Sequence, residues 1–282
     1  MTTRPIKFGA TLVGLNPIPE LVEEARQAEA AGFDVVLLPD HLGFTAPLVP
    51  LVAIAAAAPS VQVSNMVLNS SFYRPALLAR DLAAVDSVTG GRLIISLGTG
   101  YVEAEFDAAG IPFPSPGNRV KIVAETIGEL RRLLSDPGHV PPPVQTPPPI
   151  MVAAQGDKML TLAAEQADIV AVASLGDHAD LAAKVALVND KAGNRIDDIE
   201  LQFGFFQVSI DDPSDLSVIR LLEPTAPEDQ IRSLVTVLNG PVPAAAERIQ
   251  QLHEELGISY FCLNKTPGTS WATLAKLVAA VR

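Results

Sequence analysis

The sequence has a single cysteine and no excess of positive charge. Cys262 alone cannot form an internal disulfide or a cysteine-based metal site, and it lies in an apolar run, where we expect a buried, inert thiol. Lysine and arginine total 20 against 32 aspartates and glutamates, a net charge of −12. On average such a chain repels a phosphate backbone or an anionic membrane, which argues against nucleic-acid and membrane-surface binding.

Long hydrophobic runs and several catalytic motifs are missing as well. No apolar run reaches the roughly 18 residues that a membrane-spanning helix needs, and the N-terminal Met-Thr-Thr-Arg-Pro is not followed by a secretory apolar segment. We therefore expect a cytoplasmic protein. No His-x-x-x-His pair, Walker loop or Gly-x-Ser-x-Gly elbow occurs, so no motif supports a metal site or a serine hydrolase.

The chain does contain a regular alternation of short apolar runs and longer stretches with apolar residues at helical spacing. This alternation is typical of βα units around a parallel sheet. Strands are predicted at residues 6–12, 35–38, 61–68, 93–97, 150–153, 169–173, 201–210 and 260–263. A first helical stripe ends at Gly32, and further helices are predicted at residues 48–57, 75–87, 120–134, 159–166, 181–188, 231–238, 244–256 and 274–281.

Eight such units close most economically into a (β/α)8 TIM barrel, because closure leaves no exposed sheet edge. A doubly wound open sheet is the alternative. We predict that residues 1–282 form one barrel domain with two interruptions. Residues 135–149 hold seven prolines and predict an extended connector, whereas the acidic residues 211–229 predict an excursion after the seventh strand.

Polar residues directly after the apolar runs are the candidate site residues, because active sites of such barrels lie at the carboxyl ends of the strands. Asp40 and His41 follow the second predicted strand. His41 is the candidate general acid or base, since imidazole titrates near neutral pH and an adjacent carboxylate can orient it. A histidine that only packs in a loop is the alternative. Arg74, after the third strand, can meet an anionic group or pack against the next helix.

Two small-residue turns allow the backbone to approach a ligand closely. They are Gly98-Thr99-Gly100-Tyr101 after the fourth strand and Ala153-Ala154-Gln155-Gly156-Asp157-Lys158 after the fifth. The second turn precedes a predicted helix, whose free N–H groups and partial positive charge suit a phosphate, with Lys158 as a further cation and Asp157 as an opposing charge. Simple chain reversal is the alternative reading of either turn.

Taken together these residues resemble the luciferase-like monooxygenase superfamily, and within it the deazaflavin-dependent (coenzyme F420) oxidoreductases. The resemblance covers most of the chain and favours the barrel over the open sheet. It rests on residues 38–41, 67–69, 72, 74–80, 89–93, 97–101, 105–106, 110–113, 119, 148–150, 162–164 and 167–168.

The resemblance implies a cofactor in the barrel mouth, with its ring near the third strand and its phosphate on the turn after the fifth. It also implies a non-prolyl cis peptide behind the ring, which here matches the bond between Met66 and Val67. The residues implied to contact the cofactor are Met66, Val67, Asn69, Thr99, Gly100, Ala153, Ala154, Gln155, Gly156 and Lys158.

The leading hypothesis is an F420-dependent oxidoreductase that moves a hydride between the cofactor and a small organic substrate. His41 would take or supply the substrate proton, and Asp40 would hold the imidazole or touch the cofactor. Arg74 and Tyr101 are the substrate-binding candidates. Tyr101 stands where sugar-phosphate-oxidising members carry an acid, so that activity is not expected.

Two rival hypotheses remain open at this point. One is an FMN-dependent monooxygenase on the same barrel, and the other is a non-catalytic protein that binds a flavin or deazaflavin. The resemblance also suggests a homodimer formed through early barrel helices, where the alanine-rich residues 48–57 can lie. As a buried barrel helix this segment needs no partner.

Overall fold

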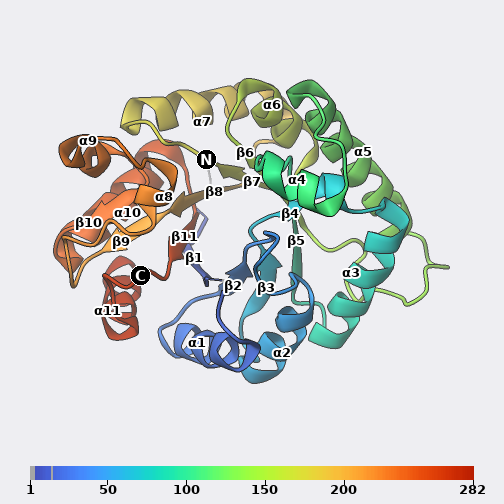
Figure 1. Cartoon of the computed structure of the whole chain (residues 1–282), viewed down its shortest axis with the longest axis horizontal. Helices are drawn as coiled ribbons and strands as arrows, with labels where there is room; N and C mark the ends of the chain where they lie inside the picture. Colours follow the sequence, from blue (N-terminus) through green and yellow to red (C-terminus); the bar gives the residue numbers. More distant parts are fainter. Residues whose placement is uncertain (1–3, 14) are drawn as a thin grey trace.

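The structure is a computed structural model that describes residues 4–13 and 15–282. Parallel strands form a sheet in the order β3-β2-β1-β11-β8-β7-β6-β5-β4, and a further pairing of β3 with β5 closes it into a barrel (Figure 1). The predicted (β/α)8 barrel is thereby confirmed. The strands of this barrel are β1 (Lys7–Thr11), β2 (Val35–Leu38), β3 (Gln62–Asn65), β4 (Leu68–Asn69), β5 (Leu93–Gly98), β6 (Ile150–Ala154), β7 (Ile169–Val172), β8 (Glu200–Phe205) and β11 (Tyr260–Asn264).

A ring of helices covers the outside of the barrel (Figure 1). It consists of α1 (Ile18–Ala30), α2 (Val49–Ala57), α3 (Pro75–Thr89), α5 (Pro116–Leu134), α6 (Asp157–Gln166), α7 (His178–Ala192), α10 (Val242–Leu256) and α11 (Trp271–Val281). The short elements are η1 (Ser70–Phe72), α4 (Glu103–Ala109), η2 (Gly193–Arg195), α8 (Ile219–Leu222) and α9 (Glu228–Ser233), with a two-stranded ribbon of β9 (Gln207–Ser209) and β10 (Val237–Asn239).

Most strand residues are buried, because helices cover one face of the parallel sheet and the barrel interior covers the other. Every residue of β2, β5 and β7 is buried. The inside of the barrel is filled by a cluster that includes Leu37, Met151 and Tyr260. A Cβ at Gly9 would collide with three side chains of this interior, so only glycine fits at that position of β1.

Three predicted elements differ from the structure. Residues 61–68 were expected to form one strand, but β3 and β4 are separated at Met66–Val67. The strand expected at residues 201–210 is interrupted at Phe206. Its backbone N–H donates to the Thr236 hydroxyl at 3.1 Å and not to a carbonyl of a neighbouring strand. The helix expected at residues 231–238 is wrong in its second half, because residues 237–239 form β10 and pair in parallel with β9.

The proline-rich residues 135–149 connect α5 to β6 and form neither helix nor strand. The connector is fixed to α3 by the buried carboxylate of Asp86. Its Oδ2 accepts the N–H groups of Val144 and Gln145 at 2.7 and 2.8 Å, and its Oδ1 accepts the Gln145 side-chain amide at 2.8 Å. One buried carboxylate on α3 therefore satisfies donors in a segment that has few ladder partners.

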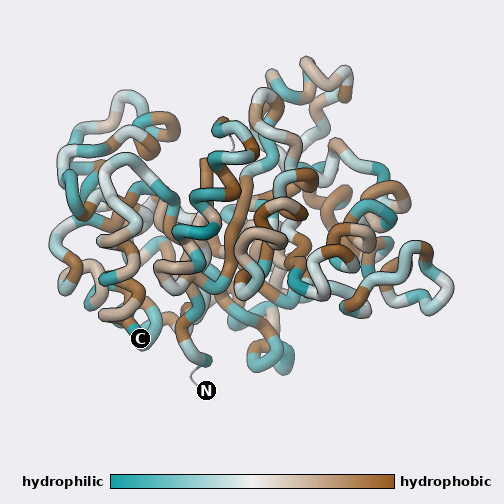
Figure 2. Tube along the Cα trace, turned by 90° about the horizontal axis from the view of Figure 1, so that it is seen from below, coloured by the Kyte–Doolittle hydropathy of each residue, from teal (hydrophilic) through white to brown (hydrophobic). Residues whose placement is uncertain are grey.

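The two ends of the barrel differ. Figure 2 shows the C-terminus on one side of the molecule and raised segments on the opposite side. Arg282 Nη2 donates to Asp34 Oδ2 at 2.5 Å, which ties the last residue to the turn before β2. Among the described residues, no helix is long and apolar enough to cross a membrane.

Candidate active site

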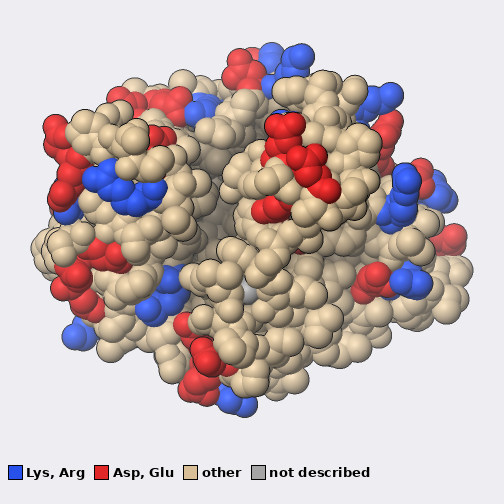
Figure 3. All heavy atoms as spheres, in the orientation of Figure 1, with Lys and Arg blue, Asp and Glu red and all other residues tan. Residues whose placement is uncertain are grey.

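The candidate site lies at the carboxyl end of the barrel, where α4 and the α8–α9 segment stand on either side of the barrel centre (Figure 1). In the space-filling view this face is hollowed between those two segments (Figure 3). Acidic side chains gather over α4, next to the hollow. The α8–α9 segment has a small apolar core of its own, which includes Leu216, Ile219 and Ile231.

His41 lies directly after β2, two residues beyond Pro39, and its ring is held by a carboxylate from a distant part of the chain. Its Nδ1 lies 2.7 Å from Glu105 Oε1, and both side chains are largely buried. With Nδ1 bonded to Glu105, Nε2 is the ring atom left to exchange a proton with a substrate. The structure thus gives His41 the environment of a general acid or base.

Glu105 reaches His41 because α4 is anchored by the residue next to it. Phe106 is fully buried, and its ring packs edge-on against Phe72 and Phe113, with ring centroids 4.9 Å away in each case. Gly110 ends the helix with a left-handed φ of +67°. We did not predict this short helix, and its sequence signal is the acidic first turn, Glu103 and Glu105, followed by Gly110.

Asp40 does not orient His41, contrary to one of the two roles expected for it. Its Oδ2 accepts the backbone N–H of Asn69 and the hydroxyl of Tyr73, each at 3.0 Å. Burial raises the pKa of Asp40, and the bonds from Asn69 and Tyr73 oppose this increase. Burial and the Asp40 carboxylate both raise the pKa of Tyr73, so its hydroxyl stays protonated and remains a donor.

The raised pKa of Asp40 predicts a pH-dependent cost to stability. The folded protein holds a proton on this carboxyl to a higher pH than the unfolded chain does, so the contribution of Asp40 to the free energy of unfolding falls as the pH rises above about 4. Asn in its place can still accept both hydrogen bonds. We expect Asp40→Asn to unfold at higher denaturant concentration than the native chain at pH 7, with the difference shrinking toward pH 4. A constant difference across this range would contradict the assignment.

Two aromatic rings flank the imidazole of His41 edge-on. Phe44 lies 5.4 Å away and Tyr101 lies 5.9 Å away, measured between ring centroids. Tyr101 is 67% exposed. Burial of part of the ring and the nearby Glu105 raise the pKa of Tyr101, so its hydroxyl is neutral at pH 7. The structure therefore places the ring of Tyr101 next to that of His41.

The bond between Met66 and Val67 is a cis peptide, as the resemblance implied. The turn after β5 packs directly on this segment. A Cβ at Gly98 would collide with Val67, and a Cβ at Gly100 would collide with Asn69. Gly100 also has a φ of +66°, which favours glycine. The candidate residues around β4 and those directly after β5, Thr99 included, therefore share one part of the barrel mouth.

The turn after β6 leads into α6 as expected. Gly156 is the N-cap residue, and no side chain caps the helix. In the described part of the chain the N–H groups of Gly156 and Asp157 form no hydrogen bond, and apart from its two chain neighbours no residue lies within 4 Å of a Cβ built at Gly156. Lys158 is exposed in the first turn. An anion can therefore approach this helix end.

These residues fit a flat ring that carries a phosphate. Met66 and Ala153 are partly buried and pack on the same apolar cluster inside the barrel. They provide an apolar floor between the β3–β4 junction and β6. Ala154, Gln155 and the open N-terminus of α6 follow directly after this floor. Among the described residues, no group of histidine, cysteine, aspartate or glutamate side chains is arranged to hold a metal ion.

Arg74 is exposed at the N-terminus of α3 and forms no ion pair or side-chain hydrogen bond with another described residue. No hydrogen bond joins it to His41 or Tyr101 among the described residues. Cys262 points into the barrel interior and is 1% exposed. Burial raises the pKa of its thiol to about 12, which confirms an inert residue.

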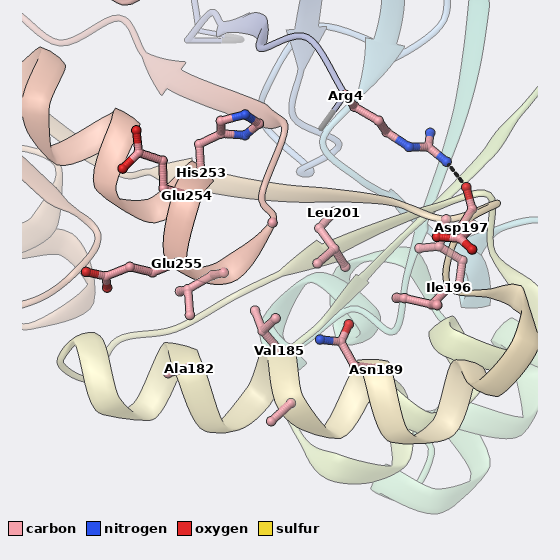
Figure 4. Close-up of a pocket in the computed structure, with 14 residues that line it drawn as sticks. Arg4, Ala182, Val185, Asn189, Ile196, Asp197, Leu201, His253, Glu254 and Glu255 are labelled. Atoms are coloured by element: carbon pink, nitrogen blue, oxygen red, sulfur yellow. Dashed lines mark hydrogen bonds between the residues drawn. The ribbon is translucent and has the colours of Figure 1, made fainter. Parts of the chain in front are cut away.

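A groove of about 310 Å³ lies at the other end of the barrel, between α7 and the end of α10 (Figure 4). Val185 and Asn189 of α7 form one wall, His253 lies on the opposite side, and Arg4 closes one end. None of the candidate site residues lines this groove. It is therefore separate from the barrel mouth.

Comparison with known proteins identifies the family. A profile described as luciferase-like monooxygenase matches residues 2–256. The chain therefore belongs to the luciferase-like monooxygenase family. Among solved structures, an F420-dependent secondary alcohol dehydrogenase in complex with an F420-acetone adduct superposes with a TM-score of 0.84 at 17% identity, over 99% of this chain and 100% of that one. The oxygenating constituent of 3,6-diketocamphane monooxygenase from Pseudomonas putida, in complex with FMN, has a TM-score of 0.78 at 15% identity, covering 99% and 98%.

Curated relatives match over shorter stretches. The 5,10-methylenetetrahydromethanopterin reductase of Methanolobus tindarius is 29% identical over 181 residues, which cover 57% of this chain and 52% of the relative. The F420-dependent glucose-6-phosphate dehydrogenase of Amycolatopsis mediterranei is 32% identical over 123 residues, 40% of this chain and 37% of the relative. The chain spans about half the length, or less, of these curated relatives.

Proposed function

We propose that the protein is an F420-dependent oxidoreductase that transfers a hydride between the deazaflavin and a small organic substrate. The observation that carries this proposal is the pair formed by His41 and Glu105, 2.7 Å apart at the barrel mouth, which leaves one imidazole nitrogen for a proton. Oxidation of an alcohol releases a proton as the hydride leaves, and reduction of a carbonyl requires one. A residue that takes or supplies this proton is therefore needed beside the substrate.

Asp40, Met66, Ala153 and the N-terminus of α6 would hold the cofactor. F420, when bound, supplies a ring that accepts or gives a hydride without readily activating oxygen. The uncapped end of α6 would bind its phosphate, with Lys158 as an added cation. The apolar floor would exclude water below the ring. Phe44 and Tyr101 would restrict the positions from which a substrate reaches His41.

Support for the deazaflavin over FMN comes from sequence relatives. The curated relatives named above include an F420-dependent dehydrogenase at 32% identity, whereas the FMN-containing structure is only 15% identical and indicates the fold alone. FMN-dependent monooxygenation is the second candidate, because the family profile is described as luciferase-like monooxygenase and a monooxygenase with bound FMN shares the fold.

A titration of the purified protein with F420 and, in parallel, with FMN tests the proposal. Cofactor fluorescence would report binding, and we expect F420 to bind more tightly than FMN. Tighter binding of FMN, together with oxygen consumption when reduced FMN is supplied, would replace the proposal with the monooxygenase. Binding of F420 without turnover of any alcohol or carbonyl compound would leave a non-catalytic cofactor-binding protein.

Glu105 is proposed as a positioning residue for His41. Gln at this position can still accept the Nδ1–H bond but carries no charge, whereas Ala removes the contact. We expect Glu105→Gln to lower kcat and Glu105→Ala to lower it by about tenfold to a hundredfold, with an unchanged Kd for F420. Glu103→Gln, on the exposed side of the same helix, is the matched control and should keep its kcat. Equal kcat in Glu105→Ala and the native protein would remove Glu105 from the mechanism.

We further propose a cytoplasmic homodimer. Every residue of α2 is apolar, and one side of this helix (Val49, Val52, Ala53 and Ala56) is partly or fully exposed, with Val49 63% exposed. An exposed apolar helix face of this kind supports a contact between copies of this chain. Sedimentation of the purified protein should give the mass of two chains. A monomer at all concentrations tested would end the dimer proposal.

A further inference from the structure

We propose that the entrance beside His41 selects small uncharged ketones or alcohols with apolar substituents, and rejects substrates that carry a carboxylate or a phosphate at that position. This inference rests on the proposed function, because the substrate in question is the one that would exchange a proton with His41. It is carried by two features of the described residues. One is a set of apolar side chains, named the apolar rim: Val13, Leu15, Leu42, Phe44 and Tyr101.

The apolar rim lies on loops that meet at the carboxyl end of the barrel. Val13 and Leu15 follow β1, which pairs with β2, and Leu42 follows His41. The hydroxyl of Thr45 donates to the Asn16 carbonyl at 3.3 Å, so the loops after β1 and β2 are joined. Large apolar side chains are exposed here, with exposed fractions of 40% for Val13, 63% for Leu15, 47% for Leu42 and 67% for Tyr101. Grouped exposure of this kind is typical of a surface that binds an apolar ligand.

The second feature is the sign of the charges near His41. The carboxylate of Glu105 pairs with His41, and that of Asp40 interacts with it electrostatically. α4 also carries Glu103 and Asp107, and acidic side chains gather over this helix next to the hollow (Figure 3). No lysine or arginine in the described ranges pairs with His41, Asp40, Glu105 or Tyr101. An anionic group brought to this place would lose water and face like charges without a cation, which disfavours its binding strongly.

A matched pair of ligands tests this inference by binding rather than by turnover. Levulinate and 2-pentanone are methyl ketones of the same chain length, and only levulinate ends in a carboxylate. The protein loaded with oxidised F420 would be titrated with each, and the absorbance of the bound cofactor would report the ketone. We expect 2-pentanone to bind at least about tenfold more tightly than levulinate.

The outcomes separate the two proposals. Failure of F420 to bind would overturn the proposed function. With F420 bound, equal or tighter binding of levulinate would overturn the substrate class alone, and so would the absence of any response to 2-pentanone.

Three variants locate the selectivity. Leu42→Lys places a cation on the apolar rim, so levulinate should bind about tenfold more tightly and 2-pentanone more weakly. Val88→Lys adds the same charge at the far end of α3, where Val88 is 67% exposed, and should change neither affinity. If levulinate binds to the native protein but not to Arg74→Gln, Arg74 recruits anions. This outcome would overturn the inference.

Discussion

Replacement of His41 by glutamine should lower kcat by about a hundredfold to ten-thousandfold, the range that a positioned general acid or base supplies. The glutamine side chain can keep a hydrogen bond to Glu105 Oε1, which accepts from Nδ1 at 2.7 Å in the native protein, but it cannot take up a proton near neutral pH. The rate of F420 reduction by an alcohol, measured in a single turnover, is the direct readout. The Kd for F420 should stay the same, because His41 is proposed to meet the substrate.

His178→Gln is the matched control for this experiment. His178 lies at the start of α7, where Nε2 pairs with Glu255 Oε2 at 3.0 Å, outside the barrel mouth. Its replacement should leave both kcat and the Kd for F420 unchanged. A His41→Gln protein that turns over at the native rate would transfer the proton role to another group, and Tyr101 would be the next residue to replace.

Removal of the Asp86 carboxylate should cost stability more than any other change considered for this chain outside the site. In Asp86→Ala the N–H groups of Val144 and Gln145 lose their acceptor, whereas the Gln145 side-chain amide keeps its bond to the Leu93 carbonyl. A hydrogen bond to a charged group contributes about 1.5–3 kcal/mol. We therefore expect a loss of about 3 kcal/mol or more in the free energy of unfolding, measured with urea. Asp86→Asn keeps one acceptor oxygen, so its free energy of unfolding should lie between those of the native protein and Asp86→Ala.

The control for this loss is Asp81→Ala on the same helix. The Asp81 side chain is 46% exposed and pairs only with its neighbour Arg80, so its removal should change the free energy of unfolding by no more than about 0.5 kcal/mol. Limited proteolysis gives a second readout, since Asp86→Ala should be cut within residues 135–149 before the native protein is. Equal stability of Asp86→Ala and Asp81→Ala would show that the connector does not depend on Asp86.

Much of the fold could be predicted because the apolar runs of buried strands and the residues that begin and end helices are local features of the sequence. The strand at Val35–Leu38 was predicted with the observed bounds, since an apolar run in a parallel sheet is short and continuous. Helix starts were predicted up to four residues late, as at α5, because the polar first turn that begins with Pro116 shows no apolar periodicity.

The wrong element, residues 231–238, shows where local pattern fails. Ile231, Leu234, Val235 and Leu238 recur at the spacing of a helix, yet α9 ends at Ser233 and β10 begins at Val237. A short apolar run fits either structure, and only the parallel pairing with Gln207–Ser209, about 30 residues earlier in the chain, decides for the strand. This pairing is a tertiary contact that periodicity does not record.

The candidate site divides in the same way. His41 and the turn at Gly156 could be identified from their places after predicted strands, and the cis bond at Met66–Val67 from the resemblance. The partner of His41 could not be identified from the sequence, because Glu105 lies 64 residues away on a helix that was not predicted. The adjacent Asp40 was the obvious alternative, but its carboxylate is already occupied by Asn69 and Tyr73.

The burial of Cys262 makes the chain convenient for site-directed labelling. Because the native thiol is inaccessible and stays protonated, a maleimide dye should react only with a cysteine introduced at the surface. Leu221→Cys on α8, a position that is 80% exposed, would place such a dye on the segment beside the hollow without removing any native residue of the site. The movement of that segment as ligands enter could then be followed by fluorescence in the otherwise unaltered protein.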